Sequence, residues 1–279
     1  MKRSLSLLLA LVPTVAILAA TPAEKAAQTA AVRYADALET GRGPELFSML
    51  PASYQKDAAT VVKAFGAAMD PDIWKEVQSL AGVFADVAFA KADLFAAMAA
   101  EKAGRPAAEI APDVQKVAKA FKSLAGKLTL DALKAGDIKA ILAYPEFAAF
   151  GETSKSMNPD AIAGAVVGSR TAEDGSVVVT FKQKDGKTED VPFTAVEGVW
   201  VPKEMSDGWK DGVKEAMEGV QSMKFDAAKK QQFLAMAPMI KSGLEGAKAA
   251  TTKEQLQQTL MMSVFGAAMM MAPQGGSAE

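Results

Sequence analysis

The chain has 279 residues, contains neither cysteine nor histidine, and carries a formal net charge of −2. These absences exclude disulfides, thiolate or histidine catalysis, and the zinc sites that cysteine and histidine build. The charges nearly balance and no segment carries a basic block, so we predict no binding to nucleic acid. We also predict no cofactor, because no cofactor-binding motif is present.

The N-terminus has the three parts of a secretory signal peptide. A basic tip, Met1-Lys2-Arg3, precedes an apolar run from Leu5 to Ala20 that ends in small residues. The run is shorter than the roughly 20 residues that a membrane-spanning helix needs, and Pro13 removes a helical hydrogen bond from it. We predict that residues 1–20 are a signal peptide, cleaved after Ala20 or after Ala23. A retained N-terminal anchor is the alternative.

Thr21 occupies the position at which a lipoprotein would carry its cysteine. We therefore predict an exported protein, periplasmic or extracellular, that is not a lipoprotein. After cleavage it is expected to have no stable insertion in a membrane.

Residues 21–157 have helical patterns. Thr21-Pro22-Ala23-Glu24 predicts a capped helix that runs to about Thr40. Asp70-Pro71-Asp72 predicts a second capped start. It is followed by apolar residues at the spacing of one buried helix face, namely Ile73, Val77, Leu80, Phe84 and Val87.

Between residues 158 and 203 the apolar residues recur at every second position, which predicts a small antiparallel sheet. We expect about four strands in a meander, at 164–171, 176–183, 188–196 and 199–202, with a tight turn at Asp185-Gly186. Pro192 has no N–H to donate, so we expect a bulge or a late start in the third strand.

Helical patterns return in residues 204–272, and residues 273–279 are predicted to be a disordered tail. Ser206 is expected to cap a helix that turns Met217 and Met223 inward, and Thr251 is expected to form a capping box with Glu254. The predicted fold class is therefore α+β and mostly helical, with one small antiparallel meander packed against helices. Residues 21–272 are expected to form one compact unit.

Helices followed by a meander that closes on Gly198-Val199-Trp200-Val201 resemble the cystatin-like or nuclear-transport-factor-like superfamily. The resemblance covers at most residues 24–202, and it implies a curved sheet wrapped against helices to make a pocket. The chain departs from that pattern in its helical stretch from about 90 to 150 and in its helical C-terminal third. No functional residue of the superfamily maps onto this sequence.

Two short motifs carry catalytic residue types. Ser53-Tyr54-Gln55-Lys56 fits the S-x-x-K pattern of penicillin-recognising enzymes, but the order of the partner motifs is wrong, and a helix start explains Ser53. Asp70 and Asp72 could pair for metal or acid–base chemistry, yet two acids around a proline are what helix capping favours.

Methionine is the unusual feature of the C-terminal third. Of fifteen methionines, ten lie from Met205 onward. The candidate partner-binding surface consists of Met261, Met262, Met269, Met270 and Met271. Core packing is the structural alternative, and Cu(I) binding by thioethers is the chemical one.

We therefore predict an exported, non-enzymatic binding protein. Its partner is either a small apolar ligand in a pocket between sheet and helices or a protein along the methionine-rich helices. One alternative is a carboxylate-type enzyme such as a polysaccharide hydrolase, which needs two acids about 5–10 Å apart. The other is a chaperone-like or Cu(I)-binding envelope protein.

Overall fold

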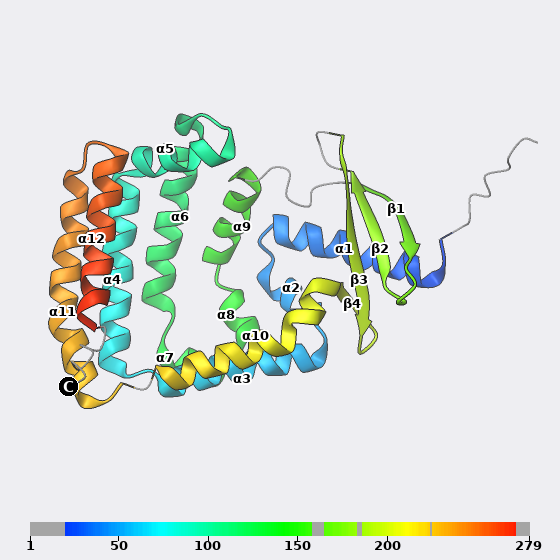
Figure 1. Ribbon diagram of the computed structural model, residues 1–279, viewed down its shortest axis with the longest axis horizontal. Helices are drawn as coiled ribbons and strands as arrows, with labels where there is room; N and C mark the ends of the chain where they lie inside the picture. Colours follow the sequence, from blue (N-terminus) through cyan, green and yellow to red (C-terminus); the bar gives the residue numbers. More distant parts are fainter. Residues whose placement is uncertain (1–19, 158–164, 183–185, 224, 272–279) are drawn as a thin grey trace, which may run out of the picture.

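The structure is a computed structural model that describes residues 20–157, 165–182, 186–223 and 225–271 (Figure 1). Side chains are described in these ranges except at 39, 102–103, 154–157, 165 and 264–271. The predicted signal peptide, but for Ala20, and the predicted disordered tail lie outside the described residues. Within these ranges, no helix is both long and apolar enough to cross a membrane.

Nine helices precede the sheet and three follow it in the part of the chain described. The first nine are α1 Pro22–Glu39, α2 Gly43–Ser48, α3 Ala52–Ala68, α4 Pro71–Ala90, α5 Ala92–Ala103, α6 Ala107–Lys127, α7 Leu130–Ala135, α8 Ile138–Leu142 and α9 Glu146–Met157. The last three are α10 Lys203–Ser222, α11 Ala227–Gly246 and α12 Lys253–Met271. A 3₁₀ turn, Ala247–Ala249, follows α11 and leads to α12.

The four strands form one antiparallel meander in the order β1-β2-β3-β4. Their bounds are β1 Ala165–Thr171, β2 Val177–Lys182, β3 Thr188–Val196 and β4 Val199–Pro202. The mostly helical α+β class with a four-stranded sheet is therefore confirmed.

The predicted irregularity at Pro192 is wrong. Pro192 pairs in register with Val178, and the shift in register lies instead in β1, between Val166 and Gly168. The pairing of β3 with β4 begins only at Phe193, so Pro192 stands at an open stretch of edge. A missing N–H is tolerated at such an edge because no neighbouring strand needs it.

Helix α1 packs against one face of the sheet. Ala27 and Ala31 of α1 pack against four strand side chains that alternate inward, and all six residues are buried. These strand residues are Val177, Val179, Phe181 and Phe193. Small residues on the helix let the sheet approach closely, so the interface between α1 and the sheet is a packed core.

The start of α1 confirms the predicted capping box. The Thr21 side chain accepts from the backbone N–H of Glu24, and the Thr21 N–H donates to the Glu24 carboxylate at 2.7 Å. The other oxygen of that carboxylate accepts from the N–H of Thr171 at 2.9 Å. The cap therefore also attaches α1 to the end of β1.

The remaining helices extend away from the sheet. Helix α4 packs between α6 and α11, and α12 packs on α11 and α5 at the end of the molecule opposite the sheet (Figure 1). Helices α3 and α10 pack side by side and connect the two ends (Figure 1). Their contact surface contains the candidate site.

Candidate functional site

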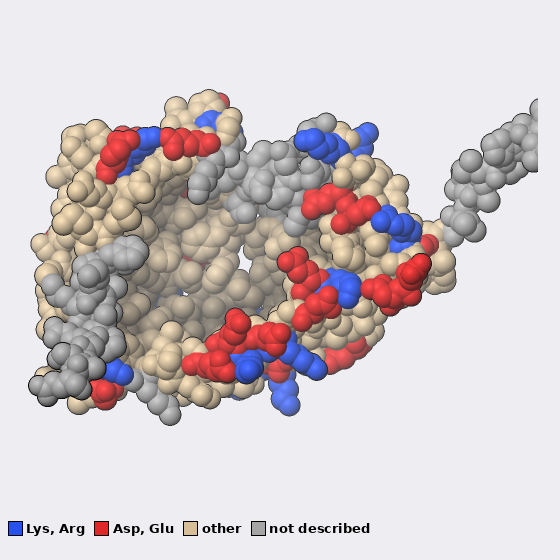
Figure 2. Space-filling model, in the orientation of Figure 1, with Lys and Arg blue, Asp and Glu red and all other residues tan. Residues whose placement is uncertain are grey.

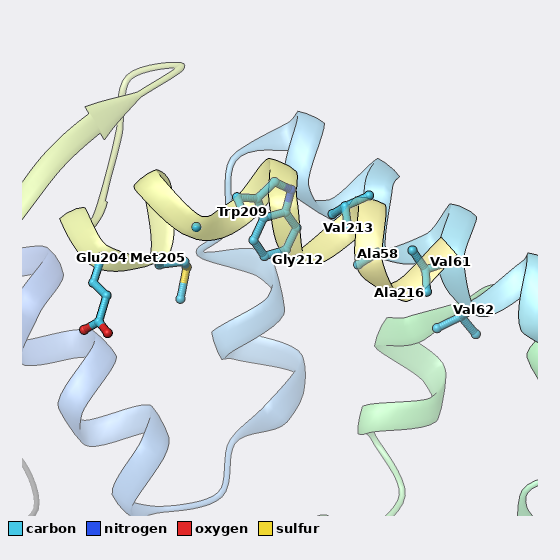
Figure 3. Close-up of a pocket in the computed structure, with 10 residues that line it drawn as sticks. Ala58, Val61, Val62, Glu204, Met205, Trp209, Gly212, Val213 and Ala216 are labelled. Atoms are coloured by element: carbon cyan, nitrogen blue, oxygen red, sulfur yellow. The ribbon is translucent and has the colours of Figure 1, made fainter. Parts of the chain in front are cut away.

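A cavity of about 480 Å³, broadly open to solvent, lies between α3 and α10 (Figure 3). Such a volume falls in the range of pockets that bind small molecules. Three lining residues come from α3 and seven from α10. They are Ala58, Val61, Val62, Glu204, Met205, Gly208, Trp209, Gly212, Val213 and Ala216.

An aromatic stack joins the two helices. The Trp209 indole lies on the Tyr54 ring with centroids 4.1 Å apart and planes 6° from parallel. The indole Nε1–H donates to the Asp57 carboxylate at 3.1 Å, and the Tyr54 hydroxyl donates to Ser206 Oγ at 3.4 Å. These contacts fix the Trp209 side chain, so this wall of the cavity is formed before any ligand arrives.

The hairpin between β3 and β4 sets where both helices start. Strand β4 ends at Pro202 and α10 begins at the next residue. In the hairpin turn, the Glu197 carboxylate accepts from the backbone N–H of Ser53, in the first turn of α3, at 3.2 Å. Hydrogen bonds from Ser53 lower the pKa of Glu197, which keeps it ionised as a cap on α3.

Helix α1 contributes a contact at the end of the cavity near the sheet. The Tyr34 hydroxyl donates to the sulfur of Met205 at 3.8 Å. Burial raises the pKa of Tyr34, so its hydroxyl remains a donor at neutral pH. Met205 is thereby held against α1 while it lines the cavity.

Small residues on α10 leave the space that the cavity occupies. Gly208, Gly212 and Ala216 follow one another at intervals of four and share one face of the helix. A Cβ atom built on either glycine would meet nothing within 4 Å. Two interior glycines weaken a helix, and both are exposed, so the space beside them is open to solvent.

Glu204 is the one ionisable residue among those that line the cavity. It points away from α10 at the end near the sheet, whereas Val61, Val62 and Ala216 lie towards the other end (Figure 3). The molecular face drawn in Figure 2 is hollowed between its two ends, with uncharged residues inside the hollow and charged side chains along its rim.

The sequence-predicted methionine surface lies elsewhere. Met261 and Met262 are 49 % and 70 % exposed on α12, at the end of the molecule far from the sheet. Met269, Met270 and Met271 belong to α12, but their side chains lie outside the described residues. Met223 was expected to face inward and is 41 % exposed, because α10 ends at Ser222 and leaves it in the cap.

The two catalytic motifs take structural positions. Ser53 lies in the first turn of α3, where its N–H meets Glu197. Asp70 caps α4 as predicted, accepting from the N–H groups of Asp72 and Ile73, and both aspartates pair with Lys230 of α11. In the described ranges, no three acidic side chains gather in a way that could hold a metal ion.

Comparisons of the chain with protein-family models, with curated proteins and with solved structures find no match. The expected likeness to cystatin-like proteins gains no support from them.

Sequence reasoning missed the residues that build this pocket, above all Trp209, Tyr54 and Glu204. A signal was present, because Gly208 and Gly212 interrupt a helix at intervals of four and flank a tryptophan. Such glycines indicate a close approach or a space. The partner helix could not be read from them, since Tyr54 and Trp209 lie far apart in the chain.

Proposed function

We propose that the chain is an exported, non-enzymatic binding protein that holds a small apolar molecule between α3 and α10. One observation carries the proposal: a cavity of about 480 Å³ lined by apolar and small residues, with a single carboxylate at one end. Burial of an apolar ligand against such walls contributes about 25 cal/mol for each Å² removed from water.

Preorganisation supports binding in this place. The Tyr54–Trp209 stack, the Trp209–Asp57 hydrogen bond and the Tyr34–Met205 contact hold the walls in position. Little free energy is then lost to ordering the protein, which is one of the costs that weaken binding.

Export is part of the proposal and is supported by the signal-peptide pattern of residues 1–20. Of the two cleavage positions, the helix cap favours the one after Ala20. Cleavage after Ala23 would remove Thr21, whose side chain and N–H complete the capping box with Glu24. Loss of such a cap costs about 1 kcal/mol.

Native mass spectrometry of the chain purified from its own host tests both parts. The polypeptide is expected to begin at Thr21 and to carry one apolar molecule that organic solvent releases. Gly212→Leu adds an apolar side chain to the cavity lining, and nothing lies within 4 Å of its Cβ position. The purified Gly212→Leu variant is expected to carry no bound molecule. If the variant and the native sequence carry equal amounts of it, the binding site lies elsewhere.

A protein partner on α12 is the second candidate. It is supported by the exposure of Met261 and Met262, which is large for apolar side chains. The same purification would show it as a co-purifying protein that the double variant Met261→Glu, Met262→Glu loses and that Gly212→Leu retains.

A further inference from the structure

We infer that the α3–α10 pocket selects amphiphiles with a positively charged head group, placing the cation beside Glu204 and Trp209 and the apolar tail along α3. The inference rests on the proposed function, because it names the ligand class of the same pocket. It is carried by the charge, the aromatic surface and the polarity of the two ends.

Glu204, whose side chain is exposed, gives the pocket a negative charge. No hydrogen bond or ion pair is described for the Glu204 carboxylate among the residues that the structure covers. The neighbouring Lys203 is directed to Asp207, at 3.1 Å, and to Asp174, at 3.9 Å. Asp57, on the α3 side, adds a second negative charge next to the indole.

Trp209 offers an aromatic surface suited to a cation. Tyr54 covers one face of its indole, and Trp209 is among the residues that line the cavity. A ligand cation is attracted to the face of an indole, and tryptophan is the best of the aromatic residues for this contact. A carboxylate on the same helix, five residues earlier, adds Coulomb attraction.

The two ends of the pocket differ in polarity, which orients an amphiphile. Glu204 and Met205 lie at the end near the sheet, and Val61, Val62 and Ala216 lie at the other (Figure 3). By the helical rise of 1.5 Å per residue, Glu204 and Ala216 are roughly 18 Å apart along α10. An alkyl chain therefore fits lengthwise, with its head at Glu204.

The test is displacement of a neutral fluorophore, N-phenyl-1-naphthylamine, by three competitors with the same decyl chain, all kept below the concentrations at which they form micelles. These are decyltrimethylammonium, 1-decanol and decyl sulfate. For the native sequence, we expect the cation to displace the probe at a concentration about five- to tenfold lower than decanol, and decyl sulfate to be weakest.

Glu204→Gln is expected to abolish most of the advantage of the cation over decanol. The matched control is Glu215→Gln, on the same helix but outside the cavity lining, which is expected to keep the advantage. Equal competition by all three compounds, or an unchanged order in Glu204→Gln, would overturn the inference while leaving apolar binding intact. Failure of the probe itself to bind would overturn the proposed function and the inference together.

Discussion

The indole of Trp209 lies flat on the ring of Tyr54, with 4.1 Å between ring centroids. This stack joins α3 to α10, and Tyr54 supports the indole that lines the cavity. Stability of the helix pair and the shape of the pocket therefore depend on the same two side chains.

Removing the indole is expected to weaken both. Trp209→Ala deletes a half-buried aromatic side chain and its stack, and should lower the free energy of unfolding by about 2–4 kcal/mol. Trp209→Phe keeps an aromatic ring and loses the hydrogen bond to Asp57, so about 1 kcal/mol is expected. Urea denaturation measures both, and equal stability of all three proteins would argue against a stack in solution.

Gly66 makes a close contact between α3 and α7. A Cβ atom at Gly66 would lie 2.7 Å from the backbone nitrogen of Lys134. Because backbone cannot move aside cheaply, Gly66→Ala is expected to destabilise the protein by about 1–3 kcal/mol. Gly82→Ala, in α4 with nothing within 4 Å, is the control and should stabilise by up to about 1 kcal/mol. Thermal melts in which both variants shift in the same direction would contradict this packing.

Glu146 should make stability sensitive to acid. Hydrogen bonds from the Lys127 amine and the Ser123 hydroxyl lower the pKa of the buried Glu146 carboxyl from 4.5 to about 2. Because the folded pKa is depressed, the stabilisation is complete above the unfolded pKa and is lost as the pH falls from there towards 2. Glu146→Gln should therefore be less stable than the native sequence near neutral pH, with the gap narrowing in acid. Urea midpoints of the two proteins can be measured from neutral pH towards pH 2. A constant difference between them would exclude a contribution of Glu146 ionisation to stability.

Methionine oxidation should follow the exposure seen on α11 and α12. Of the two methionines of α12 whose side chains are described, limited peroxide is expected to oxidise Met262 before Met261, because they are 70 % and 49 % exposed. Met236, buried on α11 with 6 % exposure, is the internal control and should react only after unfolding. Peptide mapping measures all three, and protection of Met262 in the folded monomer would remove the support for a partner surface on α12.

The sheet could be predicted because alternation and turn residues are local signals. Val177, Val179 and Phe181 alternate inward, and the glycines that separate the strands have positive φ, as at Gly175 and Gly198. The helix caps at Thr21 and Asp70 were equally local. Predictions failed where a neighbouring segment decided the outcome. Helix α10 begins at Lys203, directly after β4, so Ser206 lies inside the helix and does not cap it.

The cap of α12 is likewise shifted from the predicted capping box. Thr252 accepts from the N–H of Gln255, and Thr251 contacts the Gln255 side chain, so neither threonine pairs with Glu254. Because Thr251 and Thr252 are adjacent, either could be the N-cap, and the sequence pattern does not distinguish them. The α3–α10 pocket could not be predicted for a different reason. Its walls meet only through tertiary packing between segments about 150 residues apart, and no periodicity records such a pairing.

The most direct test of the α3–α10 pocket is a titration with N-phenyl-1-naphthylamine in three proteins. These are the native sequence, Gly212→Leu inside the pocket and Gly219→Leu further along the same helix. Both glycine positions have nothing within 4 Å of a Cβ atom, so each leucine should be accommodated and should improve helix propensity equally. We expect saturable binding of one probe per chain in the native sequence and in Gly219→Leu, and its loss in Gly212→Leu. Undiminished binding by Gly212→Leu, or no saturable binding by the native sequence, would contradict it.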